Sequence, residues 1–186
     1  MADQQAESGQ GPRPARAPRR ITADYLQRAA LHYLERYSVP AGQLRRVLAR
    51  KIAASCRHHG EDPARHTAAL DAVVARCVAT GLVDDRRFAE ARAATLRRKG
   101  QSSRAVAARL TAKGVSRELA GELAVADAGD EKAAALVAAK RRRLGPWREA
   151  GQRAASRQKD LAALARLGFD FATARSVIDG EPEGEA

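Results

Sequence analysis

The sequence is poor in aromatic residues, in cysteine and in long apolar runs. Phe, Trp and Tyr make up 4% of its 186 residues, and the two cysteines, Cys56 and Cys77, are too few for a disulfide framework. No run approaches the roughly 18 apolar residues of a membrane-spanning helix, and residues 1–20 lack the apolar stretch of a signal peptide. We therefore expect a cytoplasmic protein that is neither exported nor inserted into a membrane.

Acidic residues are also in short supply. The chain has 22 Asp and Glu against 34 Lys and Arg, which gives a formal net charge of +12. A soluble chain this basic usually meets a polyanion such as a nucleic acid, although a generally basic surface would produce the same excess. Alanine supplies much of the apolar composition. Because small side chains build thin contacts between helices, we expect several modest cores rather than one thick core.

The strongest positive signal is helical periodicity. Nine segments between residues 23 and 178 repeat apolar residues every three or four positions, and none shows the two-residue alternation of a half-buried strand. Glycines such as Gly81 and Gly100 are typical of helix ends, and short polar residues precede the helices. The sequence therefore predicts an all-α fold. The predicted N-caps are Thr22, Ser38, Asp62, Asp84, Ser102 or Ser103, Ser116 and Asp130.

Two helix junctions 54 residues apart share one pattern. Each has an inward leucine, a glycine four residues later, an apolar residue and an N-capping residue, which end one helix and begin the next at a sharp angle. The paired residues are Leu110 and Leu164, Gly114 and Gly168, Val115 and Phe169, and Ser116 and Asp170. The spacing is typical of repeat proteins, although junctions of this kind are common enough for a chance match.

The repeat predicts three tandem three-helix units, residues 22–82, 83–128 and 129–179. Leu44, Leu48 and Ile52 would form the same element in the first unit, which lacks the glycine. Residues 1–21 are predicted to be a disordered basic tail because their prolines break any helix, and residues 180–186 are predicted to be a frayed acidic tail.

Four segments resemble the RecX family, and they follow one another along the chain in the same order as in the family. Residues 30–38 followed by 44–48, residues 103–110 through 114–115, and residues 166–169 match its weaker elements. The most specific match is residues 81–89, with Asp84, Asp85 and Phe88 between Gly81 and an alanine. The resemblance extends over about residues 23–178. It departs from the family at Gln43, where an acidic residue is usual, and in the additional N-terminal tail.

The resemblance implies an elongated, curved body of three helical repeats without enzymatic activity or a cofactor. Proteins of this family bind the RecA recombinase and its filament on DNA, and they restrain strand exchange, ATP hydrolysis and co-protease activity in DNA repair and the SOS response. The implied partners are therefore RecA and single- and double-stranded DNA, bound by a monomer without sequence specificity. The family-motif residues with expected structural roles are Asp84, Asp85, Phe88, Gly114, Gly168 and Phe169.

Two residue sets were weighed as chemical sites and not favoured. Asp84 and Asp85 are adjacent on a helix, so their side chains point about 100° apart and suit capping better than shared catalysis. A zinc site is not favoured either, because Cys77 lies on an apolar helical stripe and Cys56 continues another. The candidate zinc ligands are Cys56, His58, His59, His66 and Cys77. We therefore predict no catalytic, cofactor-binding or metal-binding residue.

Basic residues are the remaining candidates for function, because guanidinium groups bind phosphate and carboxylate in a bidentate manner. The predicted contacts with DNA or the filament are Arg45, Arg46, Arg50 and Lys51 in the second helix, Arg97, Arg98, Lys99, Arg104, Arg109 and Lys113 in the middle unit, and Lys140, Arg141, Arg142, Arg143 and Arg148 in the last. The alternative function is a transcriptional regulator that uses the two helices joined at Gly114 as a helix-turn-helix.

Overall fold

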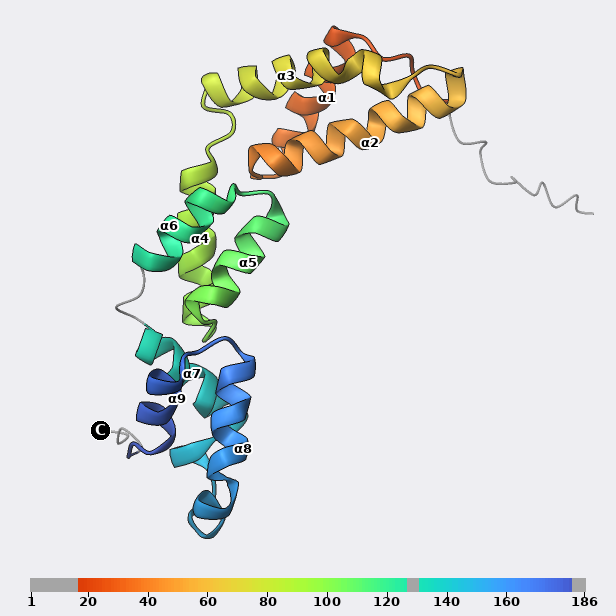
Figure 1. Cartoon of the computed structure of the whole chain (residues 1–186). Coiled ribbons are helices and arrows are strands. Elements are labelled where there is room, and N and C mark those ends of the chain that lie inside the picture. Colours follow the sequence, from red (N-terminus) through yellow and green to blue (C-terminus); the bar gives the residue numbers. More distant parts are fainter. Residues whose placement is uncertain (1–16, 127–130, 182–186) are drawn as a thin grey trace, which may run out of the picture.

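The computed structural model describes residues 17–126 and 131–181, and within these ranges the chain forms α-helices and short 3₁₀ turns but no strand (Figure 1). Across the described residues, no helix combines the length and the apolar character needed to cross a membrane. The elements are α1 (Ala23–Leu34), α2 (Ala41–His59), η1 (Pro63–His66), α3 (Thr67–Ala79), α4 (Asp85–Arg98), α5 (Ser103–Lys113), α6 (Arg117–Ala126), α7 (Glu131–Arg142), η3 (Gly145–Trp147), η4 (Ala150–Gln152), α8 (Arg153–Arg166) and α9 (Phe171–Ile178).

Local capping explains where most of these helices begin. The Thr22 hydroxyl accepts a hydrogen bond from the Tyr25 N–H at 3.1 Å, and the Asp84 carboxylate accepts one from the Arg87 N–H at 2.9 Å. The predicted caps at Asp62, Ser102 and Ser116 make equivalent bonds, each satisfying an N–H that the helix itself leaves unpaired. Asp130, the predicted cap of α7, lies outside the described residues.

The predicted cap at Ser38 is wrong. Helix α2 begins at Ala41 after Pro40, and no side chain of its own segment caps it. Instead, the Asp85 carboxylate accepts the Ala41 N–H at 2.7 Å from 44 residues away. The carboxylate at the start of α4 therefore replaces a local cap on α2.

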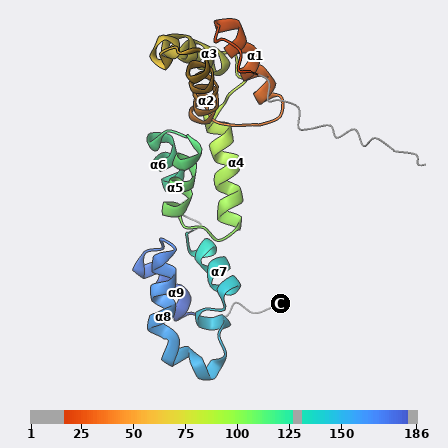
Figure 2. The same cartoon turned by 90° about the vertical axis from the view of Figure 1, so that its right-hand side faces the viewer.

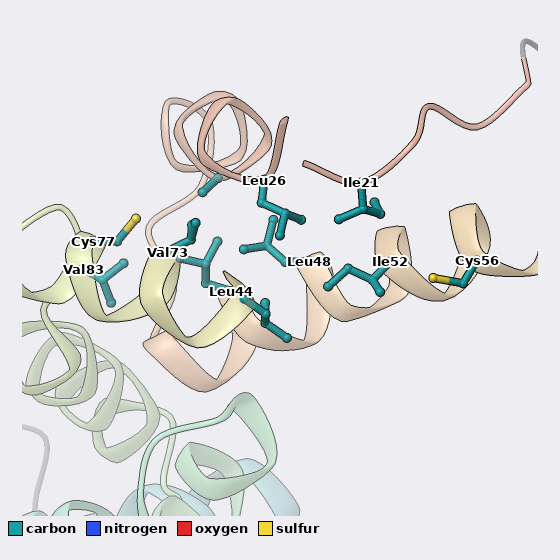
Figure 3. Packing of buried hydrophobic residues seen from close by; sticks show 11 residues of the cluster. Ile21, Leu26, Leu44, Leu48, Ile52, Cys56, Val73, Cys77 and Val83 are labelled. Carbon is teal, nitrogen blue, oxygen red and sulfur yellow. The ribbon is translucent and has the colours of Figure 1, made fainter. Parts of the chain in front are cut away.

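The helices pack in three groups of three, and each group encloses its own buried cluster. Figure 3 shows the first, in which Leu44, Leu48 and Ile52 line α2 and face Leu26 and Val73. The thin contacts expected from alanine occur in α7, whose buried residues are all alanine, and along part of α4, at Ala89 and Ala93. The main buried residues of the other two clusters are Ala89, Val106, Leu110, Val115 and Leu123 in α4–α6, and Ala135, Leu161, Leu164, Phe169 and Val177 in α7–α9.

The three groups follow one another along an elongated, bent body. Groups α4–α6 and α7–α9 stack in line, and group α1–α3 turns aside at one end (Figures 1 and 2). Helices α2, α5 and α8 lie along the inner side of this bend in Figure 1. The fold is therefore the elongated, curved all-α repeat body that the family resemblance implied.

Backbone geometry confirms the predicted repeat of the helix junctions. Gly114 and Gly168 have φ angles of +102° and +93°, in the region that favours glycine. In both junctions the following apolar residue donates its N–H to the carbonyl of the inward leucine, from Val115 to Leu110 at 3.1 Å and from Phe169 to Leu164 at 3.3 Å. Both apolar residues are buried, so each junction fixes the same sharp turn between two helices.

The end of the expected basic tail is ordered, in contrast to the prediction. Residues 17–21, here called the N-terminal strap, lie along the end of α2 because Ile21 is buried in the first cluster. The Ser55 hydroxyl donates to the Arg19 carbonyl at 2.8 Å, which fixes the strap backbone. The rest of that tail, residues 1–16, and residues 182–186 of the acidic tail lie outside the described residues.

Candidate nucleic-acid interface

The second helix of each group differs from the others in its charge. Helices α2 and α5 contain no acidic residue, and the acidic residue of α8, Asp160, is 1% exposed. Each of the other helices carries an acidic residue within it or at one of its caps. Together, α2, α5 and α8 form what we call the basic row. Its cations are Arg45, Arg46, Arg50, Lys51 and Arg57 on α2, Arg104, Arg109 and Lys113 on α5, and Arg153, Arg157, Lys159 and Arg166 on α8.

The helices of the basic row meet end to end. Where α5 ends against the start of α2, the Arg46 guanidinium donates to the Ala112 carbonyl at 3.1 Å, and the Gly42 and Gly114 backbones are in direct contact. Where α8 ends against the start of α5, the Ser102 hydroxyl donates to the Leu167 carbonyl at 2.7 Å. At each joint, the C-terminal carbonyls of one helix of the row face the N-terminus of its neighbour, α8 to α5 and α5 to α2. This alignment of helix dipoles favours end-to-end stacking of the three helices.

A carboxylate from the next group secures each joint. Asp85 begins α4 and caps α2, as described above, and Glu131 begins α7 and accepts the Ser103 N–H of α5 at 3.1 Å. The two carboxylates thus occupy equivalent positions in successive groups. Asp84 and Asp85, the adjacent acidic pair of the family motif, serve different helices: Asp84 caps α4, while Asp85 caps α2.

Two of the predicted contact residues, one buried and one half-buried, are engaged by carboxylates of the protein itself. Arg97 is only 7% exposed, and its guanidinium donates to Glu131 at 2.6 Å and to the Gln101 carbonyl at 3.1 Å. Arg148 makes two hydrogen bonds with the buried Asp160, at 2.6 and 3.0 Å. In this structure Arg97 therefore helps to hold the joint between α8 and α5, and Arg148 holds the buried Asp160.

The other predicted cations lie on the surface in two places. Arg50, Lys51, Arg104, Arg109 and Lys113 are exposed on the basic row and have no ion-pair partner among the described residues. Arg45 is exposed and pairs with Asp71. Lys99, Arg141 and Arg142 line a hollow of about 250 Å³ beside the joint between α8 and α5. Arg46 is exposed and donates to the Ala112 carbonyl at the joint between α5 and α2. The remaining predicted cations, Arg98, Lys140 and Arg143, are exposed at the ends of α4 and α7.

Sequence reasoning missed the cations that α8 contributes and Arg57 on α2. The signal was present, because the repeat offset already identified α8 as the counterpart of α5. In the sequence, Asp160 gives α8 a mixed charge, so its cations do not stand out. Only the structure shows that this carboxylate is buried and absent from the surface. The missed residues are Arg57, Arg153, Arg157, Lys159 and Arg166.

Comparison with known proteins identifies the family. A regulatory protein RecX from Myxococcus xanthus is 42% identical over 174 residues, which cover 91% of this chain and 92% of the relative. The chain belongs to the RecX family of regulatory proteins. A RecX from Agrobacterium fabrum is 29% identical over 154 residues, covering 83% of this chain and 82% of the relative. The family model for the second three-helix domain of RecX matches residues 84–122, and no solved structure matches the chain.

In this RecX protein the matched segment extends from Asp84 into α6 and so contains the capping carboxylates Asp84 and Asp85 and the Gly114 junction. Phe88 packs at the edge of the second cluster, and Phe169 is buried in the third. The family-motif residues thus lie at caps, junctions and cores. The exposed cations of the basic row come mostly from outside the matched segment.

The last group of this RecX chain is held by a buried carboxylate. Asp160 accepts the Gly145 N–H at 2.9 Å in addition to its bonds from Arg148. Burial raises the pKa of Asp160, but the hydrogen bonds from Arg148 and Gly145 and the Arg148 charge outweigh this effect and hold the pKa below its ordinary value. The ionised form is therefore the one that stabilises the turn between α7 and α8.

Replacing Asp160 by asparagine should lower the free energy of unfolding by about 1–3 kcal/mol at pH 7, because the guanidinium of Arg148 loses its charged acceptor. Since the folded pKa lies below the unfolded value of about 3.9, the carboxylate stabilises fully above that value and its effect is lost as the pH falls through the folded pKa. Urea unfolding of both proteins should show a difference that shrinks below about pH 4.

The matched control is Asp179→Asn, because Asp179 pairs with Arg157 on the surface. An exposed pair contributes at most about 1 kcal/mol. An Asp160→Asn variant that lost no more stability than Asp179→Asn would show that burial adds nothing to the role of Asp160.

Proposed function

We propose that this protein binds RecA and its nucleoprotein filament on DNA, and that it modulates, mainly by inhibition, the recombinase, ATPase and co-protease activities of RecA in DNA repair and the SOS response. Membership of the RecX family supports RecA as the partner. The observation that carries the DNA contact is the basic row, whose three helices carry cations and no exposed carboxylate and lie along the inner side of the bend (Figure 1).

The length of the basic row fits a nucleic-acid backbone. Helices α2, α5 and α8 contain 19, 11 and 14 residues, and at 1.5 Å per residue they extend for about 65 Å along the bend. Duplex DNA carries one charge per about 1.7 Å of its axis. A row of this length therefore has room for the roughly six to ten phosphate contacts of a tightly binding protein. Contacts with phosphate alone predict binding to single- and double-stranded DNA without sequence preference.

Regulation in this proposal is steric. A monomer built from the units 22–82, 83–128 and 129–179 lies along the filament and blocks the entry of DNA or substrate, without a cofactor or a catalytic step of its own. The extended basic row favours occupation of the filament groove, since a protein that caps the growing end would engage DNA at only one of its own ends. Inhibition of filament growth at far less than one protein per RecA, without net disassembly of the filament, would instead support capping.

The alternative of a helix-turn-helix regulator has less support. Its recognition helix would be α6, which carries Glu118 and Glu122, and Glu122 pairs with Arg86 through both carboxylate oxygens. Carboxylates on the helix that enters a groove repel phosphate. In addition, the turn at Gly114 packs against the start of α2 and is not an open edge.

The test of the proposal is to measure RecA-catalysed, DNA-dependent ATP hydrolysis and strand exchange with increasing amounts of the protein. Inhibition of both at or below one protein per RecA subunit is expected. If both rates stay unchanged while the protein binds one particular operator sequence, the proposal is wrong and the transcriptional alternative replaces it.

A further inference from the structure

Three side chains with metal-ligating atoms converge at the far end of α2. The Cys56 thiol, the Glu61 carboxylate and the His66 imidazole place one ligand atom each within 4.8 Å of one another. Cys56 is 3% exposed, and the side chains of Glu61 and His66 are 21% and 17% exposed. Figure 3 shows Cys56 at the end of the line of core residues on α2 that lies opposite to Leu44, and Leu44 is near the start of α2, where the joint with α5 is made. The cluster therefore lies outside the joints of the basic row.

The backbone fixes all three positions. Gly60 ends α2 with a φ of +68°, and the chain turns back so that the Glu61 N–H donates to the Cys56 carbonyl at 3.1 Å. Asp62 then caps η1, whose last residue is His66. His66 Nε2 lies 3.2 Å from Glu61 Oε2. The cluster is thus built on a helix end, a tight turn and a capped 3₁₀ turn, which bring the three residues together.

We propose that Cys56, Glu61 and His66 bind a divalent transition metal of the zinc type. A thiolate, an imidazole and a carboxylate are the ligands that zinc prefers, at distances of about 2.0–2.3 Å. Tetrahedral ligands at such distances lie about 3–4 Å from one another, so the three atoms need to move by only about 1 Å. Water takes the fourth position. The thiol proton passes to solvent on binding, and thiolate, carboxylate and metal together carry no net charge.

The N-terminal strap supplies the outer partner that such a site needs. The Arg20 guanidinium donates to Glu61 Oε1, while His66 lies beside Oε2 of the same carboxylate. A metal on the Oε2 side leaves the Arg20 bond in place, and a ligating carboxylate is normally held by a hydrogen bond of this kind. His59 Nε2 lies 2.9 Å from the Pro18 carbonyl and holds the strap from α2. Metal binding would therefore fasten the strap, α2 and η1 together.

The three converging residues differ from the candidate zinc ligands of the sequence, which are Cys56, Cys77 and three histidines and do not include Glu61. In the structure Cys77 lies on α3 in the interior of the first cluster, and His59 is engaged by the strap. The sequence could not show which subset converges, because convergence depends on the turn at Gly60.

The test uses the full-length protein stripped of metal by a chelator and titrated with Co²⁺ and Zn²⁺. We expect one Co²⁺ per chain with a thiolate-to-cobalt charge-transfer band, displacement by Zn²⁺, and a higher Tm with Zn²⁺ bound. Cys56→Ser and His66→Asn should each weaken Zn²⁺ binding by more than the roughly 10–100-fold expected for an outer partner, and Arg20→Ala should fall within that range.

The matched control is Cys77→Ser, the other buried free cysteine of the same cluster, which should keep the charge-transfer band. His66→Asn, a change on a partly exposed side chain, serves as the second variant if Cys56→Ser does not fold. No charge-transfer band in the natural protein, or a band that survives in both Cys56→Ser and His66→Asn, would overturn the proposal.

Discussion

Replacing Arg50 and Arg109 together by glutamate should weaken DNA binding by about 30-fold or more at 0.15 M salt. Each phosphate contact contributes about 0.9 to the magnitude of the slope of log affinity against log salt, so the loss of two contacts reduces it by about 1.8. Between 1 M and 0.15 M salt, this change in slope corresponds to a loss of about 30-fold in affinity. Repulsion between the new carboxylates and phosphate adds to the loss. Arg50 and Arg109 are exposed on α2 and α5 and have no ion-pair partner among the described residues, so the fold should be unaffected.

The control for this variant is Arg28→Glu with Arg36→Glu. Both arginines are exposed, at α1 or just beyond its end, and the change in net charge is the same. Fluorescence anisotropy of labelled single- and double-stranded oligonucleotides, measured over a range of salt concentrations, gives both affinity and slope. Equal losses in the two double variants would mean that overall charge, and not the basic row, determines binding. The same pair of variants in the RecA ATPase assay separates contact with DNA from contact with RecA.

The helices themselves could be predicted because their signals are local. An N-cap such as Thr22 and the N–H that it satisfies lie within one turn of chain, and a glycine such as Gly168 acts on the helix that it ends. The start of α2 could not be predicted in this way, since its cap, Asp85, belongs to the next group. The ordered conformation of residues 17–21 could not be predicted from the sequence either. Their composition is that of a tail, and a single apolar residue, Ile21, anchors them in the first cluster.

The candidate site shows the same division between local and distant information. The exposure of Arg50 or Arg109 follows from helical periodicity, so cations of this kind could be named from the sequence. The pairing of Arg97 with Glu131 could not, because the two residues are 34 positions apart and meet only when the start of α7 packs against the end of α4. The sequence shows how many charges there are, and the packing determines which of them remain available to a partner.

Glycines at the joints link the fold to the proposed function. The basic row is continuous only if α5 ends directly against the start of α2, and this contact is made by two backbones, at Gly42 and Gly114. Any side chain at either position would push the groups apart. The shape of the inner side, and with it the spacing of cations on α2 and α5, therefore depends on two residues that carry no charge.

Replacing Gly114 by alanine should separate the first two groups and destabilise the protein by roughly 2–6 kcal/mol. The backbone φ of +102° strains any residue with a side chain, and the added methyl group would lie 2.7 Å from the Gln43 backbone nitrogen and 2.9 Å from Arg46 Nη2. Strain and overpacking each cost about 1–3 kcal/mol. Movement of α5 away from α2 relieves the collision but removes the bond from Arg46 to the Ala112 carbonyl. Urea unfolding and small-angle X-ray scattering would measure the two effects.

Gly81→Ala is the matched control, because it separates strain from collision. Gly81 also has a positive φ, +72°, but a methyl group there would meet nothing within 4 Å. It should therefore cost about 1 kcal/mol and leave both the scattering curve and DNA affinity unchanged. Gly114→Ala should change the scattering curve and weaken DNA binding, since α2 and α5 would no longer present their cations along one line. If the two variants give the same scattering and the same affinity, the glycine contact does not hold the groups in register, and the basic row would have to depend on the bonds made by Asp85 and Arg46.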